Sequence, residues 1–192
     1  MAKGKITKEC ADVIVENQKK WDSHSKEWQE QWVANIGTGT EEFSVLWDTL
    51  KEIERKCNVD PWGVAWDVRY KGSYAVGQER AKNYKQHGLK ELYDAHLGLY
   101  PGVCDYEFIE FNDEVCELWC HACPVIQPLR DLGRTEEEIK EMSPLFCLFD
   151  YGIMDGFNPE LENFPQPLLI MKGDPHCSYR TEDRRPKAQR GK

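Results

Sequence analysis

The sequence predicts an α+β fold, with N-terminal helices followed by antiparallel β-hairpins packed against helices. Apolar residues recur at helical spacing over residues 8–100, which favours a series of helices. Alternation of apolar and polar residues begins at Tyr106, and a second strand pair is indicated near Leu168. Helices followed by separate strand pairs are typical of α+β proteins rather than of parallel α/β sheets.

The first predicted element is one long amphipathic helix over residues 8–36. Trp21, Trp28 and Trp32 are separated by seven and four positions, so the three indoles lie on one stripe of that helix. Such a stripe needs a large surface to cover. We expect it to contact either the rest of the chain or a second subunit, in a homo-oligomer or a larger complex.

The segment "NIGTGTEE" is expected to end this helix. Gly37 is typical of the position just past a helix C-terminus, and Thr40 is a good N-cap for the helix that follows. The break divides the chain into an N-terminal amphipathic helix that serves as an interface element, an α+β domain, and a basic tail that lacks apolar residues and is expected to be disordered. These regions comprise residues 1–38, 39–180 and 181–192.

Three further helical segments are predicted before the first strand. They are "EEFSVLWDTLKEIERKC", a segment that begins at Asp60–Pro61, and "LKELYDAHLGLY". Asp60 as N-cap with proline at the first helical position is a strong start signal. Gly63, Gly72 and Gly77 either interrupt the second segment or mark close packing against another backbone.

The remaining elements are two hairpins with a helix between them. "YEFIEF" and "EVCELWCHAC" are predicted strands joined by a turn at Asn112–Asp113. The next helix opens at Thr135 with three glutamates near its positive end, and Pro144 is expected to kink or split it. The last hairpin is predicted to pair "QPLLIMK" with "HCSYR" across a turn at Gly173–Asp174–Pro175.

Composition excludes several classes of protein. A formal charge of −9 and a pI of about 5.1 argue against nucleic-acid binding. The longest apolar run, "PLLIM", is far too short to span a membrane, and no signal peptide is visible. Eight cysteines without an export signal are typical of reduced thiols in the cytoplasm.

The stretch "CELWCHACP", at residues 116–124, is the densest concentration of reactive side chains. On a strand, Cys116 and Cys120 share one face and lie about 13 Å apart, at roughly 3.3 Å per residue. Two thiolates on one zinc ion are at most about 4.6 Å apart. A regular strand therefore prevents these two cysteines from sharing a metal, and we expect both to be buried in the core.

Cys123 differs because it precedes a proline at the end of the predicted strand, where a site can open. His121 lies on the same face, two residues earlier, as does Trp119. A second histidine and cysteine, His176 and Cys177, follow the last predicted turn. If the two hairpins converge, these residues form one site; if they do not, they are unrelated core positions.

A metal site is the alternative interpretation of the same cysteines. Cys120 and Cys123 form a C-x2-C pair, and the ligand set would be completed by Cys147 and Cys177. Thiolates with imidazole suit zinc or an iron–sulfur cluster. The other histidines, His24, His87 and His96, have no partners nearby in the sequence and are expected to be structural.

The second half of the chain resembles the L-2-amino-thiazoline-4-carboxylic acid hydrolase-like family, and more distantly it is similar to 4-vinyl reductase-type ligand-binding domains. The resemblance covers roughly residues 85–182. It is carried by an ordered set of short motifs: "CP" at Cys123–Pro124, "LG" at Leu132–Gly133, "FD" at Phe149–Asp150, "GFNPEL" at Gly156–Leu161 and "KGDPHCSYR" at Lys172–Arg180.

The resemblance implies a hydrolase that opens a small heterocycle at a C–N bond, and it makes residues 39–180 a hydrolase-like domain. It carries over Cys123, Asp150, Asn158 and Cys177 as motif positions. The extra cysteines at 116, 120 and 147 depart from the pattern and favour metal or cluster chemistry.

Three functions stay open on the sequence. In the first, a hydrolase of a small polar molecule, Cys123 is the nucleophile or a metal ligand, and His121 or His176 carries the proton. Asp150 orients that histidine or binds the substrate, and Cys177 completes the catalytic set; Asn158 and Trp119 are expected to contact the substrate. The second function is a zinc or iron–sulfur protein, and the third is a non-catalytic ligand-binding or accessory subunit.

Overall fold

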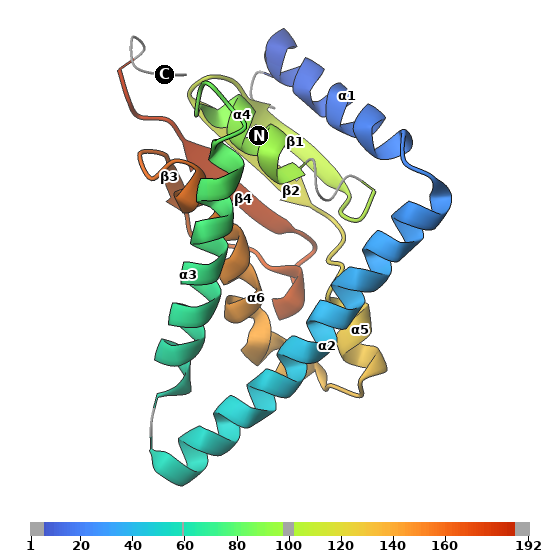
Figure 1. Ribbon diagram of the computed structural model, residues 1–192, viewed down its shortest axis with the longest axis vertical. Helices are drawn as coiled ribbons and strands as arrows, with labels where there is room; N and C mark the ends of the chain where they lie inside the picture. Colours follow the sequence, from blue (N-terminus) through green and yellow to red (C-terminus); the bar gives the residue numbers. More distant parts are fainter. Residues whose placement is uncertain (1–5, 59, 98–101, 187–192) are drawn as a thin grey trace.

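The computed structural model describes residues 6–58, 60–97 and 102–186, and it has the predicted α+β fold (Figure 1). Its helices are α1 (Lys8–Asp22), α2 (Lys26–Cys57), α3 (Pro61–Ala81), α4 (Leu89–Leu97), α5 (Ile126–Asp131) and α6 (Glu136–Phe157), with a 3-10 turn η1 (Ile170–Lys172). The strands β1 (Tyr106–Phe111), β2 (Val115–Cys120), β3 (Glu162–Phe164) and β4 (Cys177–Glu182) form one antiparallel sheet in the order β1-β2-β4-β3.

The N-terminal region contains two helices, so the single helix predicted over residues 8–36 is wrong (Figure 1). α2 begins after Ser25, whose hydroxyl accepts a hydrogen bond of 3.2 Å from the backbone N–H of Trp28. The indoles nevertheless form a cluster. The Trp28 ring lies edge-on to Trp21, with centroids 5.9 Å apart, and stacks on Trp32 at 5.3 Å.

α2 continues through "NIGTGTEE", so the predicted break near Gly37 is also wrong. Thr40, the expected N-cap, is buried within the helix, and its hydroxyl donates to the carbonyl oxygen of Ile36 at 2.8 Å. The Thr38 hydroxyl makes the equivalent bond to Ala34. Both hydroxyls therefore donate to carbonyl oxygens of the preceding helical turn. Neither accepts from the backbone N–H groups of a helix N-terminus, as a capping residue would. Position 38 lies inside α2, and the division of the chain into domains stays a prediction.

α3 and α6 pack with their backbones in contact. A Cβ atom at Gly77 would overlap the carbonyl oxygen of Ile153, and one at Gly156 would overlap the carbonyl oxygen of Tyr74. Of the two interpretations of the α3 glycines, close packing is therefore confirmed at Gly77, and the helix is uninterrupted. The predicted end of "LKELYDAHLGLY", beyond α4, lies outside the described residues.

Pro144 was expected to kink or split α6, and the helix is not split there. Proline leaves the carbonyl oxygen of Lys140 without its usual N–H donor, and the Ser143 hydroxyl replaces that donor at 2.8 Å. The start of the helix is as predicted. The Thr135 hydroxyl accepts from the N–H of Glu138, whose carboxylate accepts from the N–H of Thr135 in return.

The first hairpin is confirmed, with β2 paired to β1 across the turn at Asn112, but β2 ends at Cys120 rather than Cys123. The final hairpin is wrong. Residues 170–172 form η1, and β4 pairs instead with β2 and β3. Pro165 and Pro167 lack the N–H groups that a ladder needs, which disfavours a strand there.

The prediction that residue 181 begins a disordered tail is wrong for the first residues of that segment. β4 continues through Glu182, Thr181 is buried, and the buried carboxylate of Asp183 lies 2.6 Å from the guanidinium of Arg185. Residues 187–192 lie outside the described part of the chain.

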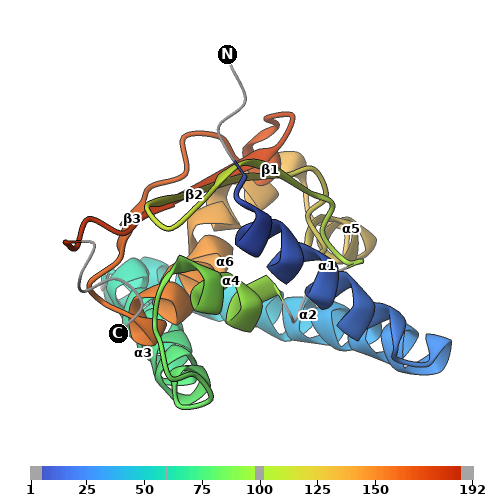
Figure 2. The ribbon, with the colours of Figure 1, turned by 90° about the horizontal axis from the view of Figure 1, so that it is seen from above.

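Helices cover one face of the sheet (Figure 2). Cys116 and Leu118 of β2 point into this layer, where they belong to a core that includes Tyr93 of α4 and Phe157 of α6. The expectation that Cys116 and Cys120 are buried is confirmed. None of the helices described is long and apolar enough to cross a membrane.

Candidate active site

A cavity of about 260 Å³ lies where the sheet, α6 and the middle of α2 meet, and five cysteines reach it. Strand register brings two of them together, because Cys120 of β2 is paired directly with Cys177 of β4. The other three are Cys147 on α6, Cys123 in the segment after β2, and Cys104 in the segment before β1. All five are free thiols.

Asp150 is the acidic group among the described residues that line this cavity. It lies one helical turn after Cys147 on α6. The Tyr179 hydroxyl donates to its Oδ2 at 3.1 Å, and Nε2 of His96 lies 3.8 Å from its Oδ1. Burial raises the pKa of Asp150 to about 6, although the Tyr179 bond and the charges of Arg69 and Arg80 oppose this shift.

His96 is buried behind Asp150, outside the set of residues that line the cavity, and stays neutral near pH 7. Burial is the largest cause, and it lowers the pKa of His96 to about 4, with a smaller contribution from the charge of Arg80. His96 was expected to be a structural residue. Its imidazole is instead a direct neighbour of Asp150, whose pKa is raised to about 6.

Arg69 of α3 supplies the positive charge at this cavity among the residues described. Its guanidinium carbon lies 5.1 Å from the centre of the Phe43 ring and 4.7 Å from that of Phe149. These cation–π contacts hold the guanidinium at the cavity wall. A planar cation in this position can bind a carboxylate in a bidentate manner.

The thiols of the cavity differ in acidity. Burial raises the pKa of Cys123 to about 12, that of Cys177 to about 11, and that of Cys147 further still. The pKa of Cys104 is lowered instead, chiefly by its interaction with the neighbouring Cys120 thiol, and burial opposes this shift.

The histidines predicted for the site are not among the residues that line the cavity. Because β2 ends at Cys120, the expected shared face of His121 and Cys123 does not exist. Nε2 of His121 lies 3.3 Å from Oε2 of Glu107, and the His176 ring stacks on Trp119 at 4.2 Å. Trp119 follows the strand alternation and faces away from the Cys120 side. Of the two alternatives left open by the sequence, Cys123 and Cys177 do line one cavity, but the histidines lie across the sheet from them.

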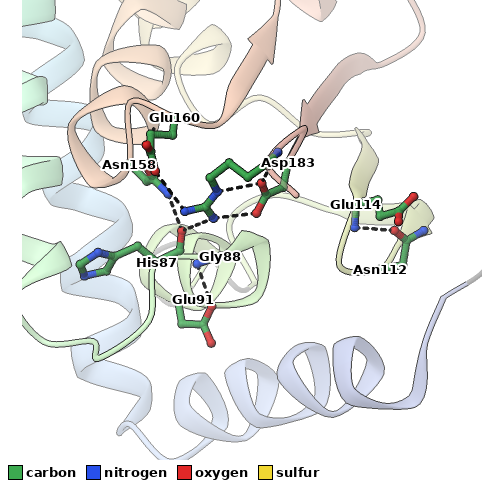
Figure 3. A network of polar contacts seen from close by, with 9 residues as sticks. His87, Gly88, Glu91, Asn112, Glu114, Asn158, Glu160 and Asp183 are labelled. Atoms are coloured by element: carbon green, nitrogen blue, oxygen red, sulfur yellow. Dashed lines mark hydrogen bonds and ion pairs between the residues drawn. The ribbon is translucent and has the colours of Figure 1, made fainter. Parts of the chain in front are cut away.

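Asn158 follows the end of α6 and is not among the residues that line the cavity; it belongs to a network of polar contacts with His87 and Glu160 (Figure 3). Its side-chain amide donates to the carbonyl oxygen of His87 at 2.6 Å, and its Oδ1 accepts from the N–H of Glu160. These bonds fix the turn that follows the helix.

The metal alternative predicted a ligand set of Cys120, Cys123, Cys147 and Cys177. All four line the cavity, yet within the described residues no group of three or more His, Cys, Asp or Glu side chains is arranged to hold a metal ion.

Sequence reasoning missed four residues of this site: Cys104, Tyr179, Arg69 and His96. Cys104 and His96 lack any spacing to a second reactive residue, and Arg69 lies in a helix with other charged residues. Only Tyr179 gave a local signal, because it alternates with Cys177 on β4 and therefore shares its face.

A model of the L-2-amino-thiazoline-4-carboxylic acid hydrolase family matches residues 64–181, more than half of the chain. The matched region contains Arg69, Cys104, Asp150 and Tyr179. The chain matches no curated protein and no solved structure.

Proposed function

The chain belongs to the L-2-amino-thiazoline-4-carboxylic acid hydrolase family, and from this premise we propose that it hydrolyses a small heterocyclic carboxylate in the thiol-lined cavity. Water is added at a ring carbon that is bonded to nitrogen, and the ring opens. The volume of about 260 Å³ suits a molecule of a few non-hydrogen atoms rather than a polymer.

Asp150 carries this proposal. A carboxyl group with a pKa of about 6 can both give and take a proton near neutral pH, which hydrolysis at a C=N carbon requires. Its neighbours support the role. The Tyr179 hydroxyl fixes Oδ2, and neutral His96 adds no charge that would hold the carboxyl permanently ionised.

Arg69 supports the carboxylate part of the substrate class. Its guanidinium faces the same cavity as Asp150 and is held by the rings of Phe43 and Phe149. Substrate bound through its carboxylate at Arg69 would present its ring to Asp150 and the thiols. The apolar remainder of the wall excludes water, which strengthens these charged interactions.

The test compares wild type, Asp150→Asn and a matched control, Glu137→Gln. Glu137 is an exposed carboxylate on the same helix. Each protein is incubated with 2-amino-thiazoline-4-carboxylate, and the ring-opened product is quantified by mass spectrometry. We expect wild type and Glu137→Gln to turn over equally, and Asp150→Asn to lose about 10²-fold or more in kcat. No turnover by wild type, or full turnover by Asp150→Asn, would refute the proposal.

A further inference from the structure

We propose that a second cavity, between α1 and the start of β1, binds a small neutral molecule that carries an amide or ureido group. This cavity has a volume of about 380 Å³, and it is lined on one side by α1 and on the other by residues 102–106. Cys104, Tyr106 and Ala122 line both this cavity and the candidate active site, so the two are neighbours. The proposed hydrolysis assigns no role to α1.

Asn17 of α1 is the residue that points to a ligand. It lines the cavity and is only 3% exposed, yet its amide nitrogen has no hydrogen-bond partner within the described part of the chain. Its Oδ1 accepts a bond of 3.4 Å from Nζ of Lys20. A buried donor without a partner destabilises a fold, and such groups are rare in native proteins. The carbonyl oxygen of a ligand would supply the missing acceptor.

The Asn17 amide can turn toward a bound molecule. Its nitrogen is enclosed by protein atoms, but the last torsion of an asparagine side chain has a broad energy minimum. Rotation about this torsion moves the amide without moving the helix. α1 is held at both ends, because the N–H of Thr7 donates to the carbonyl oxygen of Phe111 at 3.0 Å and Nζ of Lys20 lies 2.7 Å from Oδ1 of Asp94. The site therefore combines a fixed frame with one adjustable donor.

Acceptors for the N–H groups of a ligand line the same cavity. Asp105 is an exposed carboxylate at this wall. Gln18 donates from its amide nitrogen to Oδ1 of Asp22 at 2.8 Å, so its carbonyl oxygen is the atom that can accept from a ligand. A donor beside two acceptors matches a group that contains both C=O and N–H. The charge of Asp105 disfavours an anion, so a neutral amide fits this cavity better than a carboxylate.

The proposed hydrolysis would itself produce such a group. When water adds at a ring carbon of a C=N bond and the ring opens, the oxygen becomes a carbonyl oxygen on that carbon. One hydrogen of the water ends on the ring nitrogen and the other on the departing heteroatom. The product therefore carries an amide, and we expect the second cavity to bind its amide end. This identity of the ligand rests on the proposed function, whereas the amide site does not.

The test uses N-ethylurea, a neutral probe without a carboxylate, and ¹⁵N-labelled full-length protein. We expect saturable NMR shifts of the Asn17 side-chain amide and of the backbone amides of residues 103–105, with a Kd of about 1–10 mM for so small a molecule. The side-chain amide of Asn35, which is exposed on α2, should not move. Absence of a saturable shift at Asn17 would overturn the proposal.

Asn17→Leu and the matched control Asn35→Leu separate a binding role from a structural one. Leucine is close to asparagine in size and has no donor to leave unpaired. We therefore expect Asn17→Leu to weaken binding of N-ethylurea at least about tenfold, while its Tm equals or exceeds that of wild type. Asn35→Leu should bind the probe as wild type does. A lower Tm of Asn17→Leu with unchanged affinity would show that Asn17 is structural and would overturn the proposal.

Two further variants locate the bound probe. Val103→Phe adds volume to the cavity wall opposite α1 and leaves Asn17 in place, so it should abolish the shifts at Asn17 with unchanged circular dichroism. Arg69→Met alters only the candidate active site, so the Kd for N-ethylurea should not change. Loss of binding in Arg69→Met, with binding retained in Val103→Phe, would place the probe in the other cavity and overturn the proposal.

The outcomes separate this proposal from the hydrolase. None of these measurements uses a hydrolysable substrate. Binding of N-ethylurea at Asn17 by a protein that does not turn over 2-amino-thiazoline-4-carboxylate would refute the hydrolase and leave the amide site standing. Turnover by a protein that does not bind the probe would refute the amide site alone.

Discussion

The hydroxyl of Tyr179 donates a hydrogen bond of 3.1 Å to Oδ2 of Asp150, and this bond joins β4 to α6 at the wall of the cavity. It is the strongest of the influences that favour the ionised carboxylate. Burial acts in the opposite direction and is larger, so the pKa of Asp150 settles at about 6.

Removal of this donor should move the pH dependence of catalysis. In Tyr179→Phe the ionised carboxylate loses its hydrogen bond, so the pKa of Asp150 rises above 6. The proposed role of Asp150 as proton donor needs the protonated carboxyl. The alkaline fall of kcat/KM should therefore begin at a higher pH than in wild type, by up to about one pH unit. Profiles of kcat/KM from about pH 5 to pH 9 measure the shift. An alkaline limb that does not move would show that Asp150 does not supply this proton.

Asp150 should also make folding stability depend on pH. Its pKa is about 6 in the fold and 3.8 as the reference value for an unfolded chain, so the folded protein binds more protons between these values. The contribution that proton binding at Asp150 makes to the free energy of unfolding is fully present below pH 3.8. It is lost as the pH rises through 6. Asp150→Asn should therefore be more stable than wild type by about 3 kcal/mol at alkaline pH, and the difference should shrink toward acid pH. Urea unfolding at both ends of this range is the measurement, and a difference that does not vary with pH would contradict the prediction.

Arg69 should determine affinity for the carboxylate rather than the chemical step. Arg69→Met keeps an unbranched side chain between the two phenylalanine rings but removes the charge. We expect KM for the carboxylate substrate to rise about 10- to 100-fold with little change in kcat, since one charge-assisted contact is worth roughly 1.5–3 kcal/mol. The carboxamide analogue should show no such difference. Lys71→Met, an exposed cation on the same helix, is the control, and equal effects of the two variants would remove the anchor role.

The contact between α3 and α6 predicts opposite effects for two glycine substitutions. Gly156→Ala would place a methyl group on the backbone of Tyr74, so we expect it to destabilise the fold by about 3 kcal/mol. A methyl group at Gly72 meets nothing within 4 Å, so Gly72→Ala should stabilise the helix by up to about 1 kcal/mol. Thermal or denaturant unfolding of both variants measures the difference. Equal free energies of unfolding for the two variants would mean that α3 and α6 can move apart without loss of stability.

The parts of the fold that could be predicted from the sequence are those that depend on nearby residues. The alternation of β2 placed Cys116 and Cys120 inward, and the capping residues of α6 located its start. The misplaced helix break shows the limit of this reasoning. Gly37 and Thr40 are typical of a helix end, yet Thr40 is buried against the rest of the protein, and this burial overrides the local preference for a break. The residue that caps the N-terminus of α2 is Ser25.

The candidate site was predictable only in part, because most of its residues meet through contacts distant in the sequence. Cys120 and Cys177 could be placed near strand ends, but nothing local indicates that they are paired. His96 and Asp150 are neighbours because α4 and α6 pack together, which no spacing reveals. Cys104 lines the cavity beside Cys120 and Cys177, which can be seen only once the fold is known.

The position of β4 between β2 and β3 affects the order in which the protein folds during synthesis. Synthesis proceeds from the N-terminus, so β1, β2 and α6 emerge from the ribosome before the strand that carries Cys177 and Tyr179. Until that strand inserts, one edge of β2 is unpaired, Asp150 has no phenolic partner, and the thiols of β2 and α6 are open to oxidants. A nascent chain therefore passes through a stage in which the cysteines of the cavity are unprotected, and a chaperone or a reducing environment would matter most during that interval.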